Sequence, residues 1–282
     1  MFMYDVSLKI TKYFKYQMSK PTEQSKKSQS GLVISYFGNS VAVEAQDGQV
    51  FQCQLHRNQA LPVVGDKVIW QMETDHTGIV TEIEPRLSLL SRSDAHGKLK
   101  PIAANIDAIV VVMSPPPILS EYLIDRYLIA SELLKIKPII VLNKADLLDE
   151  TAKLETLKRL QTYEQIPYTV VLSSVYKKNG LDELNASLAN KTAVLVGPSG
   201  VGKSSIISAL SEGEVIRIGE VSPKGAGKHT TTATRLYHLP QGSKLIDSPG
   251  VREFNLGPVS KKDVLLGFKE FQAHLQGCKF RD

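Results

Sequence analysis

The sequence lacks any long apolar run and has few cysteines. No apolar stretch approaches the roughly 18 residues that a membrane-spanning helix needs. The N-terminal segment mixes lysines and Asp5 among its apolar residues, so it lacks the unbroken apolar core of a secretory signal. Two cysteines, Cys53 and Cys278, are too few for a disulfide framework. These absences predict a cytoplasmic protein that does not associate with a membrane.

Charge is distributed unevenly along the chain. Residues 1–30 carry six lysines against Asp5 and Glu23, a net charge of +4, whereas residues 31–88 carry a net charge of −4. A basic tail suits a polyanionic partner, but a solvated, disordered arm accounts for the same composition. We expect residues 1–30 to form a flexible basic tail.

Short alternating apolar runs fill residues 31–88, and turn signals such as Gly38-Asn39 and Asp47-Gly48 separate them. Five such runs predict a small antiparallel barrel, with an OB-fold as the leading candidate. Barrels of this kind often bind nucleic acid, but the acidic balance means that specific basic residues would have to make the contacts. Residues 89–104 are expected to be a linker.

The pattern then changes to nearly continuous apolar runs, which occupy residues 108–114, 138–144, 168–174, 192–198 and 244–250. Stretches with helical periodicity, such as 121–135 and 152–163, lie between several of them. Strands that are buried on both faces and alternate with helices predict a mostly parallel sheet in an α/β domain, here over residues 105–258. Ligands of such sheets bind beyond the carboxyl ends of the strands.

One of these strands leads into "GPSGVGKS", which fits the phosphate-loop pattern G-x-x-x-x-G-K-[ST] and opens a helix. Backbone N–H groups of such a loop cradle phosphates, Lys203 should reach the β- and γ-phosphates, and Ser204 should ligate Mg²⁺. A chance glycine-rich turn is the alternative, which the strand and helix disfavour. The expected phosphate-binding residues are Gly197, Pro198, Ser199, Gly200, Val201, Gly202, Lys203, Ser204, Ser205 and Gly250.

A second strand ends in "DSPG", which by itself is a common turn sequence. Beside a phosphate loop it predicts a Mg²⁺-linked role for Asp247 and places the Gly250 N–H near the γ-phosphate.

A third strand ends in "NKAD", where Asn143 and Asp146 can read a base edge and Lys144 can lie along the ring. A carboxylate that accepts from N1–H and N2–H₂ selects guanine, because adenine has an acceptor at N1 and buried unpaired groups are costly. Ser173 and Ser174 close another strand and could place a backbone N–H on guanine O6. For Asp146 alone, a helix cap is the alternative.

The motifs "NKAD", "LSS", "GPSGVGKSS", "GKHTTT" and "DSPGVREF" occur in that order. This order resembles the RsgA (YjeQ) family of circularly permuted GTPases, which act in assembly of the small ribosomal subunit, and the resemblance covers residues from about 30 to 282. It implies a monomeric, Mg²⁺-dependent hydrolase that converts GTP to GDP and phosphate, binds rRNA and is stimulated by the small subunit.

The resemblance also implies individual residues. Thr231 should ligate Mg²⁺ in the GTP state, together with Ser204 and Asp247. Val251 occupies the place of the usual water-orienting Gln, so His229 is the catalytic candidate; the alternative is a loop imidazole without a catalytic part. A low intrinsic rate that a partner raises is expected for a GTPase without that Gln.

Family members continue into a zinc-binding module, and Cys278 matches its first ligand while the remaining ligands are absent from this chain. We therefore expect residues 259–282 to be the truncated helical start of that domain, and Zn²⁺, although expected for the family, not to be bound by this chain. By resemblance, the barrel and linker face rRNA. The basic residues expected to contact it are Arg57, Arg92, Lys98 and Lys100.

Two other functions compete with a GTPase. A GDP-holding, RNA-binding scaffold with negligible turnover would share every binding motif. An ATPase or kinase of the P-loop class would share the phosphate loop, but Asn143 and Asp146 argue against it.

Overall fold

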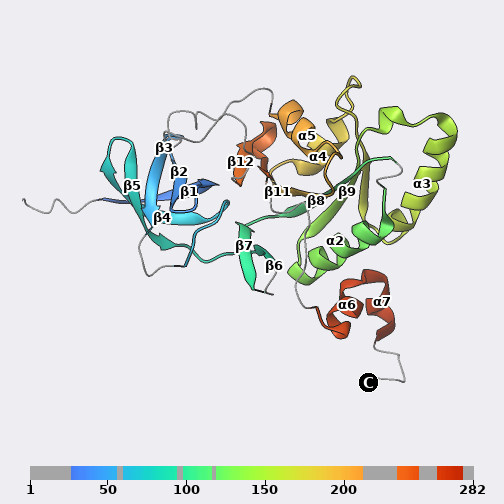
Figure 1. Cartoon of the computed structure of the whole chain (residues 1–282), viewed down its shortest axis with the longest axis horizontal. Coiled ribbons are helices and arrows are strands. Elements are labelled where there is room, and N and C mark those ends of the chain that lie inside the picture. Colours follow the sequence, from blue (N-terminus) through green and yellow to red (C-terminus); the bar gives the residue numbers. More distant parts are fainter. Residues whose placement is uncertain are drawn as a thin grey trace, which may run out of the picture.

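The computed structural model describes residues 27–55, 60–93, 98–115, 119–211, 234–247 and 259–275. It shows a β-barrel beside an α/β unit, with a pair of C-terminal helices next to helix α2 (Figure 1). None of the helices in these ranges has the length and apolarity that crossing a membrane requires.

The barrel is closed by five strands. They run in the order β1-β2-β3-β5-β4, and β4 pairs back onto β1. β3 and β5 pair in parallel, whereas the other pairs are antiparallel. The small barrel predicted from the alternating runs is confirmed, except that one of its pairings is parallel. The strands are β1 (Ser28–Tyr36), β2 (Ser40–Ala45), β3 (Val50–Leu55), β4 (Lys67–Thr74) and β5 (Thr77–Ile83).

The barrel interior is built on an aromatic pair, because the rings of Phe51 and Trp70 pack with centroids 4.6 Å apart. Val43, Cys53 and Val80 are fully buried in the same cluster. Burial, with a smaller effect of the Glu73 charge, raises the pKa of the Cys53 thiol to about 12. This cysteine is therefore an unreactive core residue.

A six-stranded portion of the same extended sheet forms the α/β unit, in the order β10-β9-β8-β11-β13-β12. All its pairings are parallel except that of the edge strand β12. Every residue of β8 is buried, as expected for a strand covered on both faces. The strands are β8 (Ala108–Met113), β9 (Lys137–Leu142), β10 (Thr169–Leu172), β11 (Thr192–Val196), β12 (Arg235–His238) and β13 (Lys244–Asp247).

Helices cover both faces of this sheet (Figure 1). Side chains of α2 and α3, including Ile124 and Leu160, pack with one set of alternating strand residues. Side chains of α4 and α5, including Leu184 and Ile206, pack with the other set. The predicted α/β architecture is confirmed. The helices are α2 (Glu121–Leu134), α3 (Glu150–Gln165), α4 (Asp182–Leu188) and α5 (Lys203–Leu210).

The segment expected to be a linker, residues 89–104, contains two antiparallel strands, here called the hairpin, on either side of residues 94–97, which lie outside the described ranges. Its strands are β6 (Leu89–Ser93) and β7 (Leu99–Ala104), and Leu90 and Ala103 are fully buried in the core shared with the α/β unit. The apolar positions of this segment are few and are interrupted by polar residues and Pro101, so the sequence alone predicts a connection between domains. The barrel likewise starts at Ser28, before the expected boundary at residue 31.

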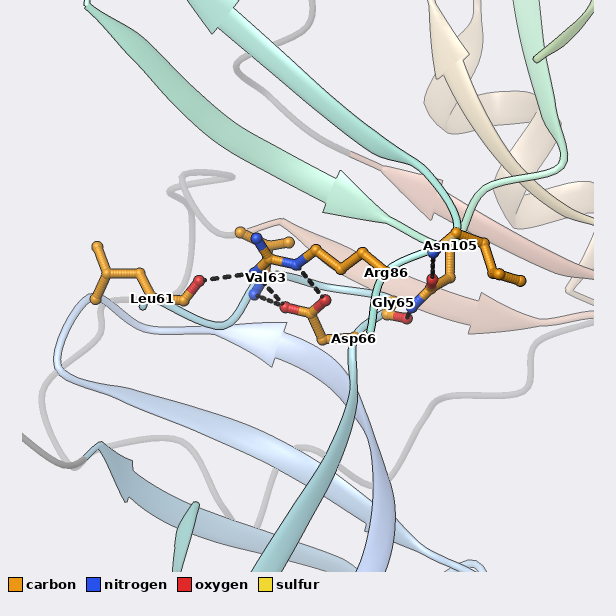
Figure 2. Close-up of polar contacts among 7 residues, drawn as sticks. Leu61, Val63, Gly65, Asp66, Arg86 and Asn105 are labelled. Carbon is orange, nitrogen blue, oxygen red and sulfur yellow. Dashed lines mark hydrogen bonds and ion pairs between the residues drawn. The ribbon is translucent and has the colours of Figure 1, made fainter. Parts of the chain in front are cut away.

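A buried ion pair fixes the segment between barrel and hairpin (Figure 2). The Asp66 carboxylate is fully buried and accepts hydrogen bonds from Arg86 Nε and Nη2, each at 2.8 Å, and from the Val63 N–H at 2.7 Å. Arg86 Nη2 also donates to the Leu61 carbonyl at 3.0 Å. The carboxylate thus has a donor for each of its oxygens, as a buried charge requires.

Asn105 adds a second tie in the same place (Figure 2). Its Nδ2 donates to the Gly65 carbonyl at 2.9 Å, and its Oδ1 accepts from the Leu87 N–H at 2.8 Å. The turn before β4, the segment after β5 and the start of the α/β unit are therefore held together by side-chain hydrogen bonds.

The barrel also meets the edge strand β12 directly. Ser35 of β1 pairs with Arg235, and Ser35 Oγ donates to the Thr234 carbonyl at 3.3 Å. His238 Nε2 lies 2.9 Å from Glu44 Oε2. The barrel therefore continues the α/β sheet beyond its edge strand.

The C-terminal helices are α6 (Lys261–Gly267) and α7 (Lys269–Leu275). A capping box between Ser260 and Asp263 starts α6. At its other end Gly267 lies against α2, where an added Cβ would come within 2.5 Å of Ile129 Cγ2. The absence of a side chain at Gly267 lets the two helices approach closely.

Replacing Arg86 with Met should destabilise the fold strongly, because it leaves the buried Asp66 carboxylate without its partner. We expect the free energy of unfolding, measured with urea, to fall by about 3–5 kcal/mol. The double variant Arg86→Met/Asp66→Asn should lose less, since no charge is left buried. Arg159→Met is the control: it breaks the exposed pair with Glu121 and should cost at most about 1 kcal/mol. Equal losses in Arg86→Met and Arg159→Met would contradict the assigned importance of the buried pair.

Candidate functional site

Four parallel strands deliver their sequence motifs to one edge of the sheet. β9 leads into Asn143, β10 into Ser173 and β11 into Gly197, while Asp247 is the last residue of β13. These strands lie within the parallel run β10-β9-β8-β11-β13. Because parallel strands point the same way, their carboxyl ends meet at the same edge. Segments that are distant in the sequence thereby form one surface.

The loop between β11 and α5 requires glycine at two positions. Gly197 has φ +138°, and a Cβ there would lie 2.1 Å from the Val112 carbonyl oxygen on β8. Gly202 has φ +96°, and its Cβ would lie 2.4 Å from Asn143 Nδ2. Both positions combine a left-handed backbone with a neighbour too close for any side chain. The loop therefore wraps tightly over the end of β8 and against the β9 loop.

Lys203, the first residue of α5, turns back into this loop. Its side chain is nearly buried, and Nζ donates to the carbonyl oxygens of Gly197 and Pro198, both at 2.7 Å. The ammonium thus lies inside the curve of the loop, at the N-terminus of a helix. Both features favour a bound anion such as a phosphate.

Asn143 ties the β9 loop to the phosphate loop. It is buried, its Nδ2 donates to the Val201 carbonyl at 2.8 Å, and its Oδ1 accepts from Ser173 Oγ at 3.1 Å. Lys144 Nζ adds a bond to the Gly200 carbonyl at 2.6 Å. The sequence predicted that Asn143 and Lys144 contact the base. It did not predict their hydrogen bonds to the phosphate loop, because no spacing rule links residues so far apart in the chain.

Asp146 is held in place by Ser174, whose Oγ donates to Asp146 Oδ1 at 2.5 Å. The same Ser174 Oγ accepts from the Tyr176 N–H at 3.2 Å. The alternative role of Asp146 as a helix cap does not apply, because the N-cap of α3 is Asp149, which accepts from the Ala152 N–H at 2.7 Å. The Asp146 carboxylate is thus positioned at the site edge and does not cap a helix.

Two oxygen-bearing side chains, Ser204 and Asp247, lie on elements that meet at this edge. Ser204 lies exposed in the first turn of α5, and Asp247 ends β13, which pairs in parallel with β11. A hydroxyl and a carboxylate are ligands of the hard type that Mg²⁺ prefers, so these residues fit that ion. Ser199 and Ser205 are also exposed on the loop and on α5.

Several expected site residues lie outside the described ranges: Gly250, His229, Thr231, Arg57 and Cys278. Of the other residues expected to contact RNA, Lys98 and Lys100 are exposed on the hairpin, and Arg92 pairs with Lys100 across it. Strand β7, on which Lys100 lies, is drawn away from α5, which follows the phosphate loop (Figure 1). In the part of the chain that the structure describes, no cluster of three or more His, Cys, Asp or Glu residues could hold a metal.

Comparison with known proteins gives the family. The sequence matches the RsgA GTPase family over residues 83–257. It is 44% identical over 260 residues to the small ribosomal subunit biogenesis GTPase RsgA of Haemophilus influenzae, covering 90% of this chain and 75% of that protein. The RsgA of Photorhabdus laumondii is 45% identical over 280 residues, covering 95% of this chain and 80% of that protein.

Solved structures agree with this assignment. YjeQ from Thermotoga maritima superposes with a TM-score of 0.70 at 27% identity, covering 88% of this chain and 84% of that one. YloQ, a circularly permuted GTPase, superposes with a TM-score of 0.68 at 27% identity, covering 93% of this chain and 85% of that one. Sequence family, fold and the two tethered loops point the same way, and the chain belongs to the RsgA GTPase family of enzymes.

Proposed function

We propose that this GTPase binds a guanine nucleotide at the carboxyl edge of the sheet, hydrolyses GTP to GDP and phosphate, and does so in assembly of the small ribosomal subunit. The observation that carries the proposal is the tether from Asn143 to the Val201 carbonyl, because it joins the phosphate loop to the guanine loop in one site. A loop that bound phosphate alone would have no need of this connection.

In the proposed complex, the loop Gly197–Gly202 surrounds the phosphates with the backbone N–H groups of its residues other than Pro198, which shapes the loop. Ser205 adds its own N–H, and Gly250 donates to the γ-phosphate. Lys203 exchanges its two loop carbonyl acceptors for phosphate oxygens, which are stronger acceptors for an ammonium. Ser204, Asp247 and Thr231 would hold Mg²⁺, which would supply charge neutralisation to the phosphates. Lys203 contributes the same kind of stabilisation from the protein side.

The base is selected by Asp146, whose carboxylate accepts from N1–H and N2–H₂ of guanine. The hydrogen bond from Ser174 supports this role, because it fixes the carboxylate before the ligand arrives. Lys144 covers the ring. The backbone N–H groups of Ser173 and Ser174, predicted to reach O6, donate instead to the carbonyls of Leu142 and Gly180 at 2.9 and 3.0 Å, so a contact with O6 would require one of these bonds to be shared. Adenine would leave the carboxylate facing its N1 acceptor, which is a costly arrangement in a partly buried site.

Hydrolysis requires a water molecule in line with the γ-phosphorus. Its oxygen forms the new P–O bond, the bond to the β–γ bridging oxygen breaks, and its proton passes to the released phosphate. Val251 cannot orient this water, so we assign that task to His229. A ribosomal partner that positions His229 beside this water would raise a low intrinsic rate.

The ribosomal role draws on the names of the relatives, which are small ribosomal subunit biogenesis GTPases. The strand order of the closed barrel supports an OB-fold, a class that often binds RNA. Arg57, Arg92, Lys98 and Lys100 are the residues assigned to rRNA contact, in a protein that works in the cytoplasm.

Asp146→Asn should change base specificity. The amide loses the acceptor pair for guanine, so GDP affinity should fall by about 10- to 100-fold. Xanthine carries a carbonyl where guanine has its amino group, so xanthine nucleotides should bind better than to the parent protein. Asp149→Asn is the matched control, since Asn caps a helix as well as Asp does. Titration with labelled nucleotides measures the affinities for guanine and for xanthine nucleotides. An unchanged GDP affinity in Asp146→Asn would show that this residue does not contact the base.

His229→Ala should lower kcat for GTP by about 100-fold or more, within the usual range for loss of a proton-transfer or water-positioning group. GDP affinity should stay unchanged, because the imidazole is assigned to the water and not to the nucleotide. His76→Ala, in the turn after β4, is the control. Equal turnover in both variants, measured as phosphate release, would exclude His229 as the catalyst.

The decisive test of the whole proposal is phosphate release from GTP and from ATP, with and without purified small ribosomal subunits. We expect release from GTP alone, with a strong rise when subunits are added. GDP binding without turnover under either condition would instead support a nucleotide-holding scaffold. Release from ATP at a comparable rate would contradict the guanine assignment.

A further inference from the structure

A second concave site lies at the opposite edge of the sheet from the phosphate loop. It is a pocket of about 490 Å³ at the amino ends of β9 and β10, bordered by the end of α4 and by α7. Strand β9 separates it from the Asn143 loop, and its six residues span about 20 Å. The two sites are therefore distinct and can be occupied at the same time. The pocket's polar lining consists mainly of Lys135, Lys137, Lys191, Lys269, Glu132 and Tyr168.

Its four lysines come from three separate parts of the chain. Lys135 and Lys137 flank the turn between α2 and β9, Lys191 precedes β11, and Lys269 begins α7. Lys135, Lys137 and Lys269 are exposed. None of the four forms an ion pair with another described residue. Four ammonium groups that converge without direct ion pairs leave a local positive potential.

Neighbouring groups reduce this potential but do not cancel it. Lys191 Nζ donates to the Ser187 carbonyl at the end of α4, and Lys135 is the C-cap of α2. Each helix end contributes roughly −0.5 charge. Glu132 is the one acidic residue of the lining, and with it the total for the lining is about +2. The charges of Glu270 and Asp125 also act on Tyr168 in the pocket wall, so the lining is cationic but has further counter-charges nearby.

Glu132 is itself engaged. Burial, followed by the nearby Glu132 charge, raises the pKa of Tyr168 well above its usual value. Lys269 Nζ lies 5.5 Å from the centroid of the Tyr168 ring, which anchors the start of α7 over the pocket. The Glu132 charge therefore acts on the tyrosine, and Lys135 and Lys137 remain exposed beside it.

The remaining wall is apolar and includes Ile136, Pro138, Ile139 and Pro167. A volume of 490 Å³ lies within the range of ligand pockets, which is about 300–1,000 Å³, and exceeds what one phosphate fills. A lysine rim over an apolar wall matches a phosphate joined to a less polar group, such as the sugar of a nucleotide unit.

We propose that this pocket is a second anion site, which binds phosphate groups of an RNA backbone through Lys137, Lys269 and Lys135. The inference that the ligand carries phosphate groups is argued from the pocket lining alone. The inference that these phosphates belong to RNA rests on the proposed ribosomal function. A free polyphosphate-bearing small molecule would present the same chemistry, and the experiment separates these two sources.

The test uses the full chain saturated with GDP, so that the phosphate loop is filled. A fluorescent single-stranded RNA of about 12 nucleotides and inorganic tripolyphosphate are titrated as separate probes. Lys137→Glu/Lys269→Glu should weaken RNA binding by about tenfold at low salt and reduce the slope of log K against log salt by about 1–2. GDP affinity and GTP turnover without subunits should remain those of the parent protein.

Lys153→Glu/Lys158→Glu on α3 is the control, because it makes the same charge change outside the pocket. Loss of RNA binding in the pocket variant alone supports an RNA phosphate. If the pocket variant loses tripolyphosphate binding but still binds RNA, the pocket binds a free phosphorylated molecule, and the proposal that its ligand is RNA is wrong. Equal effects in both variants, or none, overturn the site. A parent protein that binds RNA here but fails to hydrolyse GTP would contradict the proposed function and leave the pocket standing.

Discussion

The hydrogen bond from the Asn143 amide to the Val201 carbonyl crosses the end of strand β8, and the site depends on it. β9 and β11 are not neighbours, because β8 lies between them. The loops that follow them must therefore reach toward each other over the last residues of β8. Gly197 lies directly on the Val112 carbonyl, and Gly202 leaves the space that the Asn143 amide fills. A nucleotide bound at this edge meets a base-reading loop and a phosphate loop whose separation is already fixed.

Circular permutation leaves this arrangement unchanged and alters only what is attached to it. In the usual GTPase order the phosphate loop comes first and N-K-x-D comes last, whereas here "NKAD" precedes "GPSGVGKS". Parallel strands nevertheless bring the same carboxyl ends together whichever of them comes first. Here the edge strand β12 is covered by the barrel through Ser35 and the Glu44–His238 contact. Covering an edge strand removes a row of unpaired backbone groups. The Asp66–Arg86 pair and the hairpin fix the other side of the barrel, so it is held from two directions.

Much of this could be read from the sequence, and the failures have physical reasons. Continuous apolar runs gave the buried strands, and "GPSGVGKS" gave a loop whose glycines the backbone requires at Gly197 and Gly202. The hairpin at residues 89–104 was missed because its buried positions, Leu90 and Ala103, are too few to show a period. The tethering by Asn143 was missed because it is a tertiary contact. The lysine pocket was invisible for the same reason, since Lys137 and Lys269 are brought together only by the fold.

The two edges of the sheet are connected by one stretch of chain. β13 ends at Asp247 beside the phosphate loop, and the chain then reaches α6 and α7, whose Lys269 borders the lysine pocket. Gly267 seats α6 against Ile129 of α2, and the stacking of Lys269 on Tyr168 fixes the start of α7. A displacement of the segment after Asp247 would therefore have to break these contacts before it changed the pocket. Because the contacts are close and partly buried, the pocket's geometry is set mainly by helix packing, and an anion bound there would stabilise the same packing that forms its site.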